Sequence, residues 1–279
     1  MRKVAALAIA LLLPFVLNKA SEARPYELPR TEVVPIKDSN TGRQYELYIQ
    51  LPETYSEDAD KSYPVVYMTD ADIQMALMSG TAEFLMPEAI IVGITGQKDA
   101  DGNIVPGSRG RDFTLIKYAH LERPTGEAAN YLSFLSRDVI PYVEKHFRAN
   151  PDARAYWGYS SAAEFGAYVV IAQPETFKYY VLGSPSLDEL SMKYLDDLEA
   201  EMAAAQKTLT AHVYISMAEN DRPGRMELAE ELITVFSRHN NPGLSLTGLE
   251  VIEDTDHTTA VPETFQRSIK WLAALRSKN

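Results

Sequence analysis

Short apolar segments alternate with longer amphipathic segments along most of this chain, and this alternation constrains the fold more than any other feature. Strands that alternate with helices build a mostly parallel sheet with helices on both faces. We predict strands at 32–34, 44–51, 63–68, 89–94, 154–157, 179–182, 211–217 and 244–252. We predict helices at 127–147, 161–172, 187–205, 226–239 and 264–275. The sequence therefore predicts an α/β fold.

The strand segments differ in how their apolar residues are distributed. Segment 44–51 (QYELYIQL) alternates apolar and polar residues, which is typical of a half-buried, antiparallel strand. Segments 63–68 (YPVVYM) and 89–94 (AIIVGI) are continuously apolar, as expected for strands covered on both faces. The helix at 127–147 contains Pro141, and we expect a kink there because proline lacks the N–H that the helix needs.

The N-terminal segment has the features of an export signal. A basic start, Met1-Arg2-Lys3, precedes an apolar stretch at 4–17, and Ser21-Glu22-Ala23 places small residues at the −3 and −1 positions of a cleavage site. We predict a secretory signal peptide at 1–23 and a single domain at 24–279 that is periplasmic or secreted. An uncleaved N-terminal anchor is the alternative. No later segment is long and apolar enough to span a bilayer.

Composition excludes several classes of function. The chain has no cysteine, which excludes disulfides, thiol nucleophiles and cysteine-ligated metals. Its formal net charge of −12 argues against nucleic acid or an anionic membrane as a partner. His120, His146 and His212 have no acidic residues at metal-ligand spacing, so we expect neither a metal nor another cofactor. Nothing in the sequence indicates the oligomeric state.

One segment, 95–130, is rich in glycine and proline and has little periodicity. Irregular segments of this length in a compact domain are usually functional or disordered. Open α/β sheets bind ligands at the carboxyl ends of their strands. We therefore expect this segment to lie over that edge, beside an active site.

The chemistry centres on the sequence Gly158-Tyr159-Ser160-Ser161-Ala162, which falls between a predicted strand and a predicted helix. A sharp turn in this context raises the serine hydroxyl above the sheet, and small residues on either side let strand and helix approach closely. The backbone N–H of Ser161 is then placed to stabilise an oxyanion. The alternative is an ordinary serine at a helix N-cap.

A serine hydroxyl needs a base, and the base needs an acid that orients it. His257 follows the last predicted strand, where the base of an α/β-hydrolase lies, whereas His239 lies at a helix end that suits a surface cation. For the acid we choose Asp221, with Glu219 as the close alternative and Asp188 as a distant third.

Several further segments carry a family resemblance. They are 63–72 (YPVVYMTDAD), 91–94 (IVGI) followed by 109–114 (RGRDFT), 134–142 (FLSRDVIPY) and 183–187 (GSPSL). Together with the serine motif, they resemble in order the blocks of the putative-esterase family of α/β-hydrolases, which includes esterase D and enterochelin-type siderophore esterases. Ala71 and Ala162 stand where that family usually has glycine.

The resemblance implies an α/β-hydrolase fold, with Ser160 as nucleophile and His257 as base. It implies that the oxyanion donors are backbone N–H groups of Ser161 and of the Ala71–Asp72 turn.

Three further residues are candidates for contacts with substrate. Tyr159 adjoins the nucleophile, and Arg109 and Arg111 are suited to hold an acidic group. An equally good alternative is that the two arginines pair with carboxylates nearby in sequence, at positions 99, 101 or 112.

The function predicted from these residues is that of an exported serine hydrolase, which cleaves carboxylic esters of small molecules through an acyl-enzyme. A periplasmic siderophore esterase, acting on a trilactone, is the alternative within the family. A catalytically inactive binding protein on the same fold is the alternative of another class. An acyltransferase would use the same residues, and the sequence does not distinguish it from a hydrolase.

Overall fold

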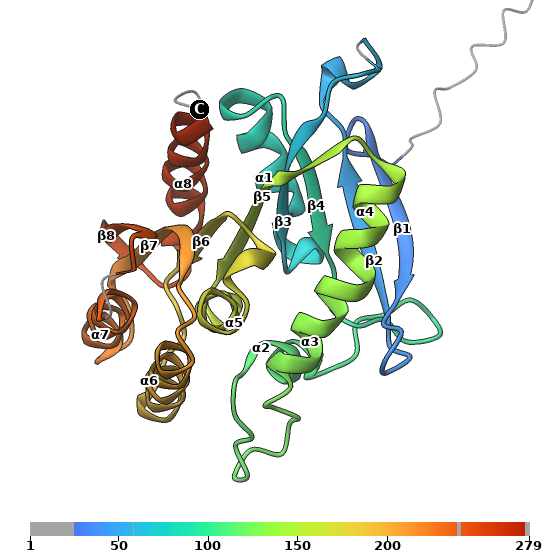
Figure 1. Cartoon of the computed structure of the whole chain (residues 1–279). Helices are drawn as coiled ribbons and strands as arrows, with labels where there is room; N and C mark the ends of the chain where they lie inside the picture. The colour runs from blue at the N-terminus through green and yellow to red at the C-terminus, as the bar shows by residue number, and fades with distance from the viewer. Residues whose placement is uncertain (1–24, 58, 239–240, 277–279) are drawn as a thin grey trace, which may run out of the picture.

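The computed structural model describes residues 25–57, 59–238 and 241–276. Its eight strands form one sheet in the order β1-β2-β4-β3-β5-β6-β7-β8 (Figure 1). The strands are β1 (Thr31–Lys37), β2 (Gln44–Gln50), β3 (Tyr63–Met68), β4 (Ile90–Ile94), β5 (Ala149–Tyr159), β6 (Tyr179–Gly183), β7 (Thr210–Asn220) and β8 (Gly243–Asp256). Strands β3 to β8 pair in parallel, while β1 and β2 are antiparallel at one edge. The predicted α/β fold is confirmed.

Helices cover both faces of the sheet, as Figure 1 shows. One face packs against α1 (Ala71–Leu85) and α8 (Ala260–Arg276). The other face packs against α2 (Ser108–Phe113), α3 (Ala128–Phe134), α4 (Ile140–His146), α5 (Ser161–Ala172), α6 (Glu189–Ala204) and α7 (Arg225–Ser237). Short 3₁₀ turns, η1 (Glu53–Ser56) and η3 (Pro174–Thr176), lie in the connections.

Strand β3 shows how the sheet holds both layers together. Val65 and Tyr67 belong to one apolar cluster, and Val66 and Met68 belong to the cluster on the opposite face. All four side chains are fully buried. This is the period-2 alternation of a strand, and it explains the continuous apolar run, because both faces are covered.

The sequence pattern predicted no helix at α1, and the exposure of its side chains gives the reason. Met75, Met78 and Ala82 are buried, but Ile73 is 74% exposed and Phe84 is 85% exposed. Apolar residues therefore lie on the solvent face as well as on the buried face. A helix with this distribution has a weak apolar stripe and little periodic signal.

The helix predicted around Pro141 consists of three parts. Between α3 and α4 lies a π-helical segment, η2 (Leu135–Val139), and Pro141 occupies the first turn of α4. Proline cannot donate the usual backbone hydrogen bond, and its ring clashes with the carbonyl one turn earlier. The wider π turn just before Pro141 is one of the known ways in which a helix accommodates such an interruption.

The segment at 95–130 is more structured than predicted. It contains α2, and Lys98 forms isolated bridges with Gln44 and Ile104. Residues 128–130 begin α3, and most of the remaining segment consists of turns and irregular structure.

The predicted signal peptide at 1–23 and His239 lie outside the described residues. Of the helices that the structure describes, none combines the length and apolar character that a bilayer crossing requires.

The close approach of β5 and α5 generates a stability prediction. A Cβ atom added at Gly158 would lie 2.5 Å from the carbonyl oxygen of Ala162, a backbone atom that cannot move aside. We expect Gly158→Ala to lower the free energy of unfolding by about 2 kcal/mol or more, as overpacking does. Urea unfolding followed by circular dichroism measures this change.

Gly80 in α1 is the matched control, because a Cβ atom there meets nothing within 4 Å. Gly80→Ala should raise the free energy of unfolding by about 0.5–1 kcal/mol, since glycine is unfavourable inside a helix. Equal stability of the two variants would contradict the close approach.

Candidate active site

Ser160 lies in a strained turn between β5 and α5. Its φ of 62° and ψ of −124° fall in a region that non-glycine residues rarely adopt. The Ser160 N–H donates to the Gly183 carbonyl at 2.8 Å, which fixes the turn against β6. Ala162 is fully buried, so a methyl group fits at the position where glycine was expected. The turn therefore holds the Ser160 hydroxyl above the carboxyl edge of the sheet.

Three side chains from separate loops meet at this turn. The Ser160 Oγ lies 2.9 Å from Nε2 of His257, and Nδ1 of His257 lies 2.7 Å from Oδ2 of Asp221. The Asp221 side chain is only 3% exposed, while His257 is 26% exposed. These are hydrogen-bond distances, so the three groups can act as nucleophile, base and orienting acid.

The alternative acid, Glu219, has a different partner. Its Oε2 accepts a hydrogen bond from the backbone N–H of Asp254 at 2.7 Å. Glu219 is the last but one residue of β7, and this bond ties that strand to the end of β8. The structure thus brings Asp221 to His257 and assigns Glu219 to the strand pair. Asp188, the third candidate, caps α6 through the N–H of Ser191.

Two helix N-termini lie side by side at the turn. Helix α5 begins at Ser161 and α1 begins at Ala71, immediately after the adjacent parallel strands β5 and β3. The first N–H groups of a helix have no partner within it, and they stabilise negative charge. The methyl group of Ala71 lies against Gly93, which has no Cβ atom, so alanine fits here as well. Asp72 accepts a hydrogen bond from the N–H of Gly96.

Arg109 links these two turns. Its Nε and one Nη donate to the two carboxylate oxygens of Asp70 at 2.8 and 2.9 Å, and the same Nη donates to the Tyr159 carbonyl at 3.1 Å. Asp70 precedes Ala71 and has a positive φ of 57°. A bidentate arginine–carboxylate pair fixes both distance and orientation. Arg109 therefore holds the residues that precede both candidate oxyanion donors, and Asp70 is a partner that the sequence analysis did not name.

The other two candidates for substrate contact are buried. Arg111 pairs with Asp112 at 2.7 Å and also donates to Gln97, so its guanidinium is used inside the fold, as the alternative interpretation held. Tyr159 is 3% exposed, and burial raises the pKa of its hydroxyl to about 12. Neither side chain is placed to bind substrate in this structure.

Sequence reasoning missed Ser186 as a neighbour of the nucleophile. The Ser186 Oγ lies 2.9 Å from the Ser160 Oγ, and its N–H donates to the Ser160 carbonyl at 3.1 Å. Its position in the GSPSL segment at the end of β6 is the signal that could have indicated this residue.

A buried carboxyl group lies beneath the turn. Glu164, in the first turn of α5, is 2% exposed, and its Oε1 has no hydrogen-bond partner among the described residues. Burial, reinforced by the nearby charge of Asp188, raises the pKa of Glu164 to about 8. Glu164 is therefore mostly protonated at neutral pH.

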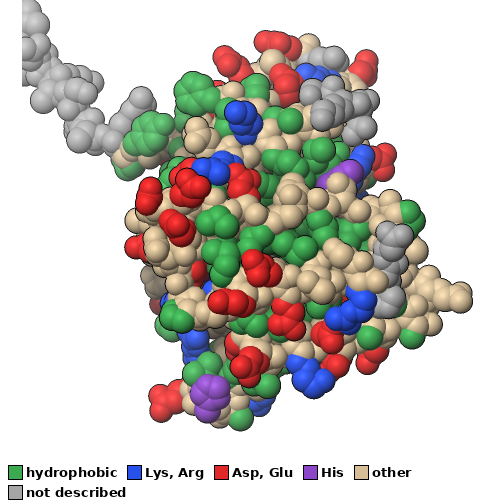
Figure 2. Space-filling model, turned by 90° about the vertical axis from the view of Figure 1, so that its left-hand side faces the viewer, with side chains coloured by type: hydrophobic (Ala, Val, Ile, Leu, Met, Phe, Trp, Pro, Cys, Tyr) green, Lys and Arg blue, Asp and Glu red, His purple; other side chains and the backbone are tan. Residues whose placement is uncertain are grey.

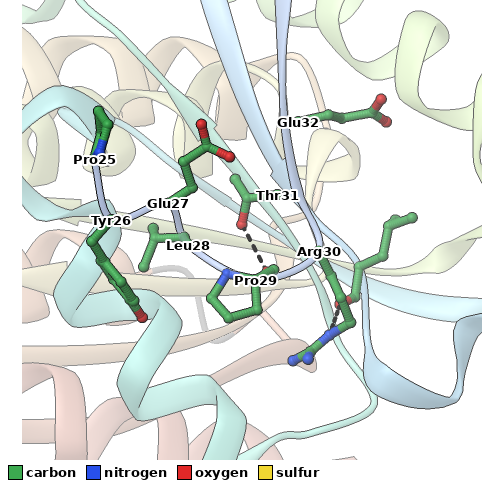
Figure 3. A pocket seen from close by; sticks show the side chains of 9 residues that line it. Pro25, Tyr26, Glu27, Leu28, Pro29, Arg30, Thr31 and Glu32 are labelled. Carbon is green, nitrogen blue, oxygen red and sulfur yellow. Dashed lines mark hydrogen bonds between the residues drawn. The ribbon is translucent and has the colours of Figure 1, made fainter. Parts of the chain in front are cut away.

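A separate concavity lies elsewhere. It has a volume of about 810 Å³ and is lined by residues 25–32 and Leu51 at the start of β1 (Figure 3). Two hydrogen bonds shape it, from Thr31 to the Pro29 carbonyl and from Arg30 to the Leu51 carbonyl. None of these residues is a candidate site residue. In the parts of the chain that the structure describes, no three histidine or acidic side chains gather as metal ligands.

The sheet order, the strained serine turn after a parallel strand and the histidine after the last strand define an α/β-hydrolase. Comparison with known protein families shows which family of α/β-hydrolases this chain belongs to. The chain belongs to the Esterase family, described as Putative esterase, which matches residues 39–251. This family assignment agrees with the esterase class predicted from the sequence.

Individual relatives agree with this assignment. The ferri-bacillibactin esterase BesA of Bacillus subtilis is 29% identical over 179 residues, which are 58% of this chain and 60% of that protein. The chain thus matches less than two thirds of that relative's length.

Two solved structures share the fold. The BES protein from Bacillus cereus has a TM-score of 0.78 at 20% identity, over 91% of this chain and 99% of that one. The siderophore hydrolase EstA from Aspergillus nidulans has a TM-score of 0.70 at 21% identity, with the same two coverages.

The buried Glu164 generates a prediction about pH and stability. Between its ordinary value near 4.5 and about 8, the unfolded chain loses this proton while the folded protein keeps it. The contribution of Glu164 to the free energy of unfolding should therefore fall as the pH rises through this range, by at most about 5 kcal/mol. Glu164→Gln should remove this dependence and be more stable than wild type at pH 8.

Chemical denaturation at pH 5 and pH 8 measures the effect, with the exposed Glu175→Gln as control. If wild type and Glu164→Gln lose stability equally between the two pH values, Glu164 is already ionised in the folded protein.

Proposed function

We propose that this chain is an exported serine hydrolase that cleaves carboxylic esters through an acyl-enzyme. The observation that carries the proposal is the continuous hydrogen-bonded series from Asp221 through His257 to Ser160. The strained turn at Ser160 and the two neighbouring helix N-termini support it, since they supply a raised nucleophile and donors for an oxyanion. The N-terminal sequence supports export.

In the first step, the Ser160 Oγ attacks the ester carbonyl carbon while Nε2 of His257 accepts the hydroxyl proton. The carbonyl electrons move onto the oxygen, which the N–H groups of Ser161 and of the Ala71–Asp72 turn stabilise. Asp221 holds the imidazole in place and stabilises its positive charge. The tetrahedral intermediate then expels the alcohol, which leaves with the proton from His257.

In the second step, water attacks the acyl group on Ser160 and His257 accepts a proton from that water. Breaking the bond between the acyl carbon and the Ser160 Oγ releases the carboxylic acid and returns the proton to the serine. His257 is 26% exposed, so water can reach it.

A siderophore ester is the second candidate substrate. The relatives named for ferri-bacillibactin and siderophore hydrolysis favour it. Arg225 at the start of α7 also favours an anionic ester: it is half-buried, forms no ion pair among the described residues and donates to the Pro185 carbonyl, next to Ser186. Against a strongly anionic ligand, Figure 2 shows many carboxylate side chains on the flank that carries α6, α7 and α8. Arg225 would attract an anionic substrate and the surface carboxylates would repel it, so a direct comparison of substrates is needed to choose between the two esterase functions.

The nucleophile is tested with a fluorophosphonate probe and a p-nitrophenyl ester. We expect stoichiometric labelling of Ser160 in wild type, located by peptide mass spectrometry. Ser160→Ala should lose the label and at least roughly a thousandfold in kcat/KM while keeping its melting temperature.

His257→Ala should behave in the same way, because the serine loses its base. His146→Ala is the matched control, since His146 lies on α4 and bonds to the Tyr142 carbonyl. Label and turnover that persist in Ser160→Ala would exclude the proposal.

The two substrates are separated by comparing a catechol trilactone with p-nitrophenyl acetate. A siderophore esterase should have a kcat/KM for the trilactone that is higher by roughly a hundredfold or more. Arg225→Met should then raise KM for the trilactone alone, and the exposed neighbour Arg222→Met should not. Faster hydrolysis of the acetate in wild type would favour the small-ester esterase.

A further inference from the structure

We propose that the hydroxyl of Tyr159 is a positioning group, which holds the loop of His257 against the turn of Ser160. The inference rests on the proposed function, in which His257 is the base. It assigns Tyr159 a role other than the substrate contact expected from the sequence.

The Tyr159 hydroxyl contacts two loops at once. It lies 2.8 Å from the backbone carbonyl of His257 and 3.1 Å from the Ser184 Oγ. The Tyr159 and His257 rings also lie close, with centroids 5.3 Å apart. The residue immediately before the nucleophile is thus bonded to the backbone of the residue that activates it.

The direction of these bonds follows from counting protons. A tyrosine hydroxyl has one proton, and a carbonyl oxygen can only accept, so Tyr159 must donate to His257. Ser184 must then donate its own hydroxyl proton to the Tyr159 oxygen. The Ser184 Oγ in turn accepts from the N–H of Ala218 at 3.0 Å. A chain of three hydrogen bonds therefore runs from Ala218 through Ser184 and Tyr159 to His257.

This chain reaches all three parts of the candidate site. Ala218 lies near the end of β7, and its carbonyl accepts from the N–H of Asp221. Tyr159 precedes Ser160, and the chain ends on His257. Ser184 has a φ of 39°, a strained value for a residue with a side chain, and its N–H donates to the Ser216 carbonyl. The strained backbone places the Ser184 hydroxyl between the two strands that carry the nucleophile and the acid.

Packing fixes the Tyr159 ring that carries the hydroxyl. The ring stacks on Trp157, which stacks on Phe265 of α8 with centroids 3.8 Å apart. A Cβ atom at Gly183 would lie 2.5 Å from the ring, so only glycine leaves room for it. Because the ring is held on two sides, its hydroxyl can occupy only one position. Removing the hydroxyl frees the His257 loop without moving the ring.

Tyr159→Phe tests the role because it deletes only the oxygen. We expect kcat for p-nitrophenyl acetate to fall by roughly tenfold to a hundredfold, since small displacements of a base are costly. KM should change less than about twofold, because the deleted oxygen is buried and contacts no substrate. Fluorophosphonate labelling of Ser160 should slow by the same factor as kcat.

Tyr180→Phe is the matched control. It removes another buried hydroxyl, one that bonds to the Pro174 carbonyl on η3, and it should leave kcat unchanged. Ser184→Ala should lower kcat less than Tyr159→Phe, because Tyr159 can still donate to His257. The double variant Tyr159→Phe/Ser184→Ala should be no slower than Tyr159→Phe alone, since the two hydroxyls act in one chain.

The outcomes separate the two proposals. If wild type neither hydrolyses esters nor takes the label, the proposed function fails and this inference fails with it. If wild type is active but Tyr159→Phe keeps the kcat of Tyr180→Phe, only the positioning role is overturned. A rise in KM at constant kcat would overturn it too, and would make Tyr159 a substrate contact.

Discussion

The close approach of β5 and α5 is the constraint on which the site depends. The two elements can meet only because Gly158 has no side chain and Ala162 has a small one. Their contact forces the chain through the positive φ of Ser160, a conformation that would be unfavourable in an isolated peptide. The surrounding sheet offsets this unfavourable conformation, because strand β5 before the turn is paired on both sides and buried at its carboxyl end. The fold thus maintains one strained residue at the place where a raised hydroxyl is needed.

The remaining geometry follows from the order of the strands. Since β3 and β5 are neighbours, the two helices that follow them begin at the same edge of the sheet, where their first N–H groups have no partner within the helix. The salt bridge between Arg109 and Asp70 joins these two starting points, so their spacing does not depend on flexible loops. The same guanidinium is then no longer free to bind substrate with its full fork. In this structure Arg109 therefore holds the two turns together, whereas the sequence suggested that it holds an acidic group of the substrate.

The sequence predicted the features that depend on local pattern. Uninterrupted apolar segments predicted the strands of the sheet, and the small residues around Ser160 predicted the nucleophile turn. The order of residues along the chain predicted His257 as the base. Asp221 and Glu219 remained alternatives, because both follow the same strand and only the tertiary structure decides which side chain reaches the imidazole. The partner of Arg109 could not be predicted for a similar reason, since Asp70 lies 39 positions away. Helix α1 was missed because Ile73 and Phe84 are apolar but exposed, which weakens the contrast between its two faces.

Helix α8 has a practical consequence for how the protein can be handled. It begins at Ala260, just after His257, and returns along the sheet for 17 residues, a length of about 25 Å. Its far end therefore lies away from the edge of the sheet at which α5 begins (Figure 1). A solid support or a fusion partner joined beyond this helix would leave the approach to Ser160 unobstructed. Immobilisation through that end is thus compatible with access of even a bulky ester.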